Sequence, residues 1–173
     1  MTLKNAVAGL FAAAVIAASM LLPTAANAQA DPKVARAMAL LKADTGALGA
    51  PKVEGTDPVG GRTAPALFFG TTKMNNYFTV VDNVVKSVGG TATLFVKSGD
   101  EYVRVATNVK KDDGSRAIGT ILDPKGKAIV EINAGKAFYG EVDILGKLYV
   151  TGYDPIKDAS GAVIGIYYVG YLK

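Results

Sequence analysis

Two arginines near the middle of the chain are the residues best suited to binding chemistry. The segment RVATNVKKDDGSRAIGT spans residues 104 to 120 and places Arg104 and Arg116 twelve residues apart, with an acidic, glycine-containing turn between them. Each is followed by residues typical of a β-strand. A guanidinium group covered by protein must be paired, and a carboxylate can pair it through two hydrogen bonds. Both arginines could instead point into solvent; we expect at least one to turn inward and bind an anion.

A second group of polar residues alternates along the segment KLYVTGYDP. Alternation puts Lys147, Tyr149, Thr151 and Tyr153 on one strand face, and Tyr139 can reach the same side from a neighbouring strand. These side chains either line a polar pocket or pack as an aromatic face with hydroxyls at its rim. The candidate ligand-binding residues are therefore Arg104, Arg116, Tyr139, Lys147, Tyr149 and Tyr153.

The composition excludes several kinds of chemistry. The chain has no cysteine and no histidine, so it lacks thiol nucleophiles, disulfides, Ser-His-Asp triads and the usual zinc ligands. Its formal net charge is +4, with both signs interspersed and no basic block of the kind that binds nucleic acid. We expect no cofactor, no metal and no nucleic-acid partner.

Paired carboxylates leave one catalytic alternative open. Glu141 and Asp143 lie two residues apart and share a strand face, which is compatible with a hydrolase that uses carboxylates alone. A solvated, charged strand face explains the pair more simply. Asp112, Asp113 and Gly114 are better explained as turn formers than as a calcium loop, whose remaining ligand spacing is missing. We expect a protein that is not an enzyme.

The N-terminus has the pattern of a secretory signal peptide. Lys4 precedes an apolar stretch over residues 6–22, Pro23 ends it, and small-residue cleavage sites follow. The alternative is an uncleaved membrane anchor. We expect residues 1–30 to be removed and residues 31–173 to form a single domain, with no second apolar segment of spanning length.

The remaining sequence predicts an α+β fold, with a five-stranded antiparallel sheet and the N-terminal helix packed against it. Asp31 and Pro32 begin that helix and Gly46 ends it. The expected later elements are an irregular surface segment over 46–66, a helix capped at Asn75-Asn76, strands over 91–97 and 102–109, a shorter extended segment over 116–123, a helix over 124–134, and strands over 137–144, 148–156 and 162–172.

Strict alternation also assigns faces to the strand that carries the first arginine. It groups Tyr102, Arg104, Ala106 and Asn108 on one face, and Val103, Val105 and Thr107 on the other.

Three segments carry a resemblance to a known family: GGTATLFVK at 89–97, YVRVATNVKKDDGSRAIGT at 102–120, and GEVDILGKLYVTGYDPIKDASGAVIGIYYVGY at 140–171. They resemble the single-Cache extracytoplasmic sensor domains of the Cache 3/Cache 2 fusion type. The resemblance implies a PAS-like fold with a long N-terminal helix. It also implies binding of small metabolites outside the cytoplasm, often carboxylates or amino acids.

Most members of that family sit between two membrane helices in chemoreceptors or histidine kinases. Since this chain ends at Lys173, just past the last expected strand, we expect a periplasmic, stand-alone module that is a monomer or weak dimer. It would bind a small carboxylate or amino acid and pass the bound state to a membrane receptor or histidine kinase. The alternative is a scaffold protein that uses the same fold without a ligand.

Overall fold

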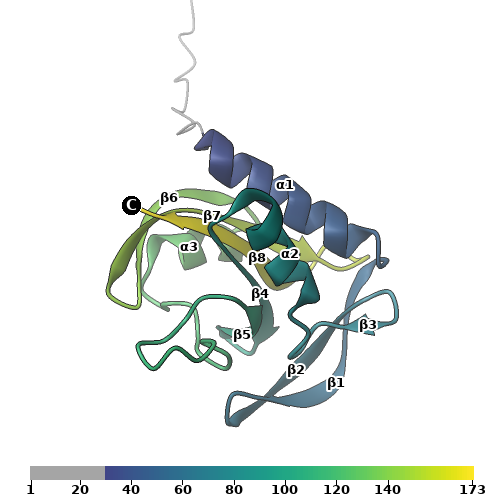
Figure 1. Ribbon diagram of the computed structural model, residues 1–173. Coiled ribbons are helices and arrows are strands. Elements are labelled where there is room, and N and C mark those ends of the chain that lie inside the picture. Colours follow the sequence, from purple (N-terminus) through teal and green to yellow (C-terminus); the bar gives the residue numbers. More distant parts are fainter. Residues whose placement is uncertain (1–29) are drawn as a thin grey trace, which may run out of the picture.

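The computed structural model describes residues 30–173 (Figure 1). The predicted signal peptide therefore lies, but for its last residue, outside the described residues. The elements follow in the order α1 (Pro32–Gly46), β1 (Pro51–Val59), β2 (Arg62–Phe69), β3 (Thr72–Lys73), α2 (Thr79–Val88), β4 (Thr91–Ser98), β5 (Glu101–Thr107), α3 (Lys127–Asn133), β6 (Phe138–Ile144), β7 (Lys147–Lys157) and β8 (Val163–Leu172).

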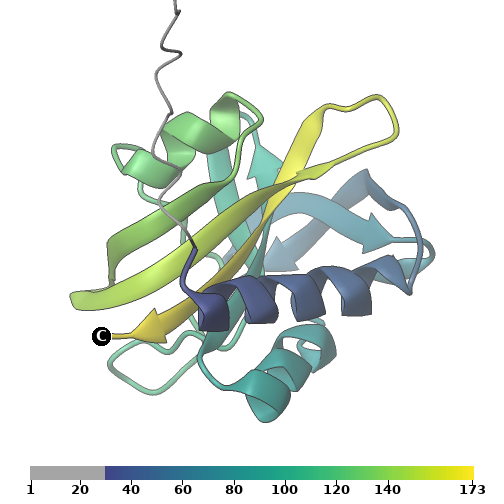
Figure 2. The ribbon, with the colours of Figure 1, turned by 90° about the horizontal axis from the view of Figure 1, so that it is seen from above.

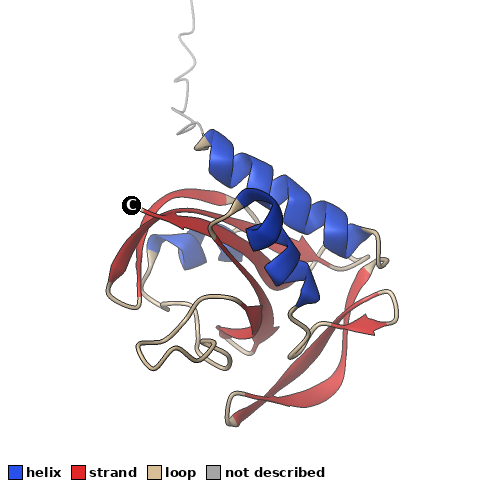
Figure 3. Ribbon diagram, viewed as in Figure 1, coloured by secondary structure: helices blue, strands red, loops and turns tan. Residues whose placement is uncertain are grey.

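A five-stranded antiparallel sheet forms the centre of the fold, in the order β5-β4-β8-β7-β6, as the sequence predicted. Helices α1 and α2 cover one face, and α3 lies on the other (Figures 1 and 2). The arrangement of helices around the strands is clearest when the elements are coloured by type (Figure 3). The two faces bury separate apolar clusters, so the sheet divides a helix-covered side from a side closed by α3 and the β5–α3 connection, residues 108–126.

Helix α1 packs closely on the sheet through one apolar face. Asp31 caps it by accepting a hydrogen bond from the Lys33 amide at 2.8 Å. Val34 lies over Gly152 of β7, where an added Cβ atom would come within 2.9 Å of the valine side chain. Lys42 also forms an ion pair with Asp154 of β7. The predicted packing of the N-terminal helix against the sheet is confirmed.

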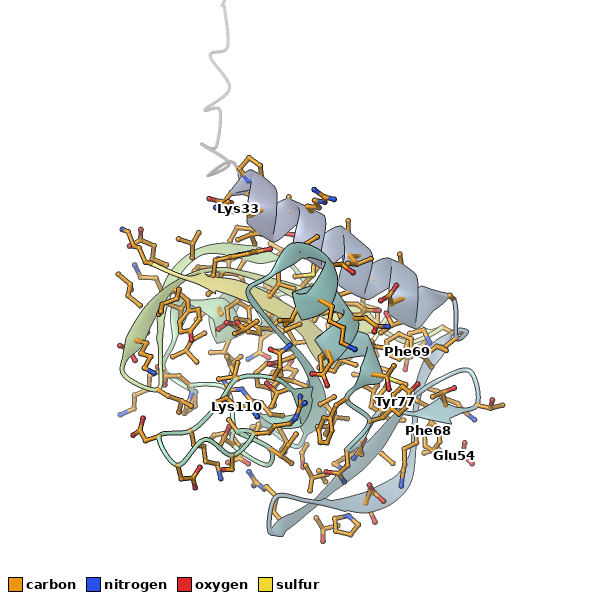
Figure 4. All side chains as sticks on the ribbon, viewed as in Figure 1. Lys33, Glu54, Phe68, Phe69, Tyr77 and Lys110 are labelled. Atoms are coloured by element: carbon orange, nitrogen blue, oxygen red, sulfur yellow. The ribbon has the colours of Figure 1, made fainter. Side chains whose placement is uncertain are left out.

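The expectation of an irregular segment over residues 46–66 was wrong. Strands β1, β2 and β3 form a second, three-stranded sheet. Gly60 and Gly61 make the two-residue turn between β1 and β2, both with positive φ. Strand β1 contains two prolines and is exposed at most of its positions, so it lacks the apolar alternation that marks a strand. Phe68 and Glu54 lie on this hairpin (Figure 4).

Two other local predictions also need correction. The second helix begins at Thr79 with Phe78 at its cap, while the Asn75 side chain bonds the backbone of β2 at Leu67 and Pro65. The segment over 116–123 is not a strand, although residues 119–122 hydrogen-bond the free edge of β5: Arg104 N donates to Thr120 O and Leu122 N donates to Tyr102 O, both at 2.9 Å.

A β-bulge in β5 changes which residues share a face. Leu94 pairs with Ala106 and Phe95 pairs with Arg104, so Val105 is an extra residue without a partner on β4. Ala106 therefore packs on the helix-covered side, and the Asn108 amide donates to Val81 O of α2. Arg104 remains on the opposite side, beside Phe95. The alternation that grouped Arg104 with Ala106 and Asn108 was wrong because of this one inserted residue.

The tip of the β1–β2 hairpin is pressed against the β5–α3 connection. A Cβ atom at Gly60, whose φ is +56°, would lie 2.2 Å from the Ile118 carbonyl oxygen, while one at Gly61, whose φ is +84°, would meet nothing within 4 Å. The second sheet thus supports the segment that borders Arg104.

We expect Gly60→Ala to lower the free energy of unfolding by about 3 kcal/mol or more, because it combines left-handed backbone strain with a backbone clash. Gly61→Ala incurs only the backbone strain, roughly 1–2 kcal/mol. Urea denaturation of both variants measures the difference, and equal losses would contradict the close contact.

Candidate ligand-binding site

Arg104 is a buried cation that has no anionic partner among residues 30–173. Its exposed fraction is 5%. One terminal nitrogen, Nη1, donates to Thr120 Oγ1 at 2.6 Å and makes a long contact of 3.5 Å with Ile121 O, while Nε has no partner in the described part of the chain. The guanidinium carbon lies 4.9 Å from the centre of the Phe95 ring. Burial lowers the pKa of Arg104, since desolvation disfavours the charged form.

A pocket of about 260 Å³ adjoins the Arg104 side chain. It lies between the β5–α3 connection and the end of β6 with its turn into β7. Its lining residues are Arg104, Ile121, Leu122, Asp123, Val142, Asp143, Ile144, Leu145 and Tyr153. Apolar side chains share this wall with one buried guanidinium, one buried phenol and the two exposed aspartates, Asp123 and Asp143. A small number of polar groups among apolar ones is the usual make-up of a small-molecule site.

Tyr153 provides a neutral donor beside this cation. Its ring packs 5.0 Å from that of Tyr168 and 6.1 Å from that of Phe138. Burial raises the pKa of Tyr153 well above its ordinary value, with a smaller opposing effect from Arg104, so the phenol stays protonated at neutral pH. Burial likewise raises the pKa of Tyr168, whose hydroxyl lies 3.0 Å from Thr91 Oγ1. Tyr153 can therefore donate a hydrogen bond to an acceptor in the pocket.

The charge of Arg116 is compensated by a carboxylate of the fold, and Arg116 does not line the pocket. It forms a two-point ion pair with Asp82 of α2, at 2.7 Å and 2.8 Å, and donates to Thr107 O at 2.8 Å. Its guanidinium also lies 4.4 Å from the ring centre of Phe78. These contacts tie the β5–α3 connection to α2.

The other predicted site residues are not brought together in the pocket. Tyr139 packs on the helix-covered side against Gly152, opposite to Arg104. Lys147 is exposed at the start of β7. Tyr149 lies on the same side as Tyr153 but is not among the pocket-lining residues. The geometry thus unites Arg104 with Tyr153 alone.

Sequence reasoning missed the residues that complete the surroundings of Arg104. Thr120 and Ile121 contact its guanidinium, and Phe95 packs under it across the bulge. The only local signal was the closeness of Thr120 and Ile121 to Arg116 in the sequence, which pointed to the other arginine.

The carboxylates considered for catalysis are exposed. Glu141 pairs with Lys173 at 2.5 Å, and Asp143 Oδ1 accepts a hydrogen bond from the Gly146 amide at 2.9 Å. Asp113 forms a local turn by accepting from the Ser115 amide at 2.8 Å. Within residues 30–173, no cluster of three or more potential metal-ligating side chains is found.

An α+β domain with two helices on one sheet face and, on the other, a third helix and a pocket beside a buried cation has the form of a small-ligand sensor module. The chain matches the Cache 3/Cache 2 fusion domain over residues 10–173. It therefore belongs to this family of sensor domains, which confirms the resemblance seen in the sequence. Cache domains bind small ligands, are usually extracytoplasmic and are typically non-catalytic. A comparison with curated proteins finds no match.

The described helices give no sign of a membrane span. None of those in residues 30–173 combines the length and apolar character needed to cross a bilayer.

The same substitution at the two arginines should have opposite effects on stability. Arg116→Met leaves Asp82 without its partner, so we expect the free energy of unfolding to fall by about 1–3 kcal/mol. Arg104→Met removes a buried charge without an anion, so we expect stability in the absence of ligand to be unchanged or raised by up to about 3 kcal/mol. Denaturant melts of the two variants measure this. If Arg104→Met lowered the free energy of unfolding as much as Arg116→Met does, Arg104 would be shown to stabilise the fold.

Proposed function

We propose that this protein binds a small, carboxylate-bearing metabolite reversibly, with the carboxylate held by Arg104. The observation that carries the proposal is a buried guanidinium that borders a pocket and has no anionic partner among residues 30–173. Burying a charge without a counter-ion is costly, and a bound carboxylate would offset that cost.

The proposed contacts need only groups that already border the pocket. The carboxylate would accept from the Arg104 guanidinium, and the Tyr153 hydroxyl would donate a further hydrogen bond. Leu122, Val142 and Ile144 supply apolar walls that exclude water, which strengthens these polar contacts. The mechanism is recognition alone. We do not extend it to Arg116, Tyr139, Lys147 or Tyr149, because none of them lines the pocket.

The proposal includes the cellular role expected from the sequence. The protein would act as a stand-alone periplasmic module after removal of residues 1–30, and its bound form would be recognised by a membrane receptor or histidine kinase. Such a switch requires the ligand to favour one of two conformers. The contact of Arg104 with Thr120 offers a route, since the ligand and the β5–α3 connection share this guanidinium. Osmotic-shock fractionation followed by N-terminal sequencing tests the location and the cleavage.

Thermal unfolding in the presence of small carboxylates tests the binding. A ligand at one hundred times its Kd adds about 2.7 kcal/mol of stability, so we expect the melting temperature to rise by several degrees. Arg104→Met should abolish the rise, while Lys147→Gln, which removes a positive charge outside the pocket, should keep it. If no carboxylate or amino acid stabilises the wild-type protein across a broad panel, the scaffold alternative is favoured instead.

A further inference from the structure

Two free strand edges face each other across the pocket. Strand β6 is an outer strand of the five-stranded sheet and, among the described residues 30–173, pairs only with β7. On the opposite side, the β5–α3 connection adds residues 119–122 to the other outer strand, β5. Asp143 of β6 and Ile121 of the connection both line the pocket. In Figure 1 the turn that joins β6 to β7 lies beside this connection.

The backbone N–H and C=O of Asp143 point away from β7. Ile144 and Lys147 close a two-residue turn and form a hydrogen-bonded pair, so the next pair, Asp143 with Leu148, is not hydrogen-bonded to each other. The Leu148 carbonyl accordingly accepts from Lys173 N at 3.0 Å on the far side of β7. The N–H and C=O of Asp143 must therefore project from the free edge of β6.

The backbone of Ile121 is free in the same sense. Thr120 O and Leu122 N bond β5, which leaves the N–H and C=O of Ile121 directed away from that strand. In the described part of the chain, the Ile121 carbonyl makes only the long contact of 3.5 Å with Arg104 Nη1. Within residues 30–173, the pocket is thus bordered by two stretches of strand backbone without hydrogen-bond partners and by a buried guanidinium without an anionic partner.

We propose that the ligand is a short peptide with a free C-terminus, which inserts as an extended segment between residue 121 and the edge of β6. This rests on the proposed function, since the C-terminal carboxylate is the anion held by Arg104. The peptide amide would pair with the free backbone groups of Ile121 and Asp143, in the manner of strand addition. The pocket of about 260 Å³ has room for a ligand on the scale of a dipeptide of small residues.

Calorimetric titration of the whole mature protein with three matched ligands tests the inference. Glycylglycine is the probe, 5-aminopentanoate has the same charges and chain length without the amide, and glycylglycinamide lacks the carboxylate. We expect glycylglycine to bind at least about tenfold more tightly than 5-aminopentanoate, because one to two hydrogen bonds are lost. The carboxamide should show no measurable binding.

Each alternative result has a separate meaning. If 5-aminopentanoate binds as tightly as glycylglycine, the peptide inference is overturned while carboxylate binding stands. If glycylglycinamide binds as tightly as glycylglycine, the carboxylate is not recognised and both proposals fail. If none of the three ligands binds, the peptide inference fails, and the carboxylate panel of the previous subsection decides the proposed function.

Proline substitution tests the edge itself. Asp143→Pro removes the outward N–H without breaking a bond to β7, and we expect it to weaken glycylglycine binding about threefold to tenfold. Asp143→Ala loses the same carboxylate but keeps the N–H, so it is the reference for the proline variant. Glu141→Pro removes an equivalent outward N–H beyond the pocket and should leave binding unchanged. Equal affinities for Asp143→Pro and Asp143→Ala would overturn the role of this edge.

Discussion

The position of Arg104 depends on a single inserted residue, Val105. The far end of β5 is fixed on the helix-covered side, where Asn108 accepts from the Ala92 amide and donates to α2. With strict alternation from that point, residue 104 would face the helices as well. The bulge reverses the alternation of side chains between the two faces, so the Arg104 guanidinium lies on the other face of the sheet, above Phe95. The buried cation beside the pocket, and with it the proposed ligand, follows from that reversal.

Backbone contacts fix the border of the pocket on the Arg104 side of the sheet. Residues 119–122 pair with the edge of β5 as a short, irregular extension, and Gly119 is held against Gly60 at the tip of the β1–β2 hairpin. The second sheet therefore braces the wall of the pocket without contributing a lining residue. Gly119, next to Thr120, contacts the tip of the β1–β2 hairpin backbone to backbone. If ligand binding displaced Thr120, side-chain rotation could not absorb the displacement, and the hairpin would move with it.

Features coded by neighbouring residues were predictable, and features set by distant contacts were not. Asp31 and Pro32 start a helix wherever it packs, and the hairpin of β6 and β7 is marked by its own alternation and turn. Strand β1 is exposed along most of its length, so its sequence carries no apolar signature. The bulge at Val105 leaves no trace in the order of residue types. The inward direction of one arginine could be anticipated, but Arg104 and Arg116 could not be told apart, because Asp82 is supplied by a different element.

That difference between the two arginines is the strongest reason to place function at Arg104. Both are substantially covered, and both lie over an aromatic ring. Arg116 has a carboxylate on two nitrogens and a carbonyl besides, so its charge is compensated within the fold. Arg104 contacts a hydroxyl and a distant carbonyl, and its Nε has no partner among residues 30–173. The fold supplies Asp82 to the guanidinium of Arg116 but, within residues 30–173, no carboxylate to that of Arg104. Burying the charge of Arg104 without a counter-ion costs free energy that packing alone does not explain. A ligand that brings its own negative charge accounts for it.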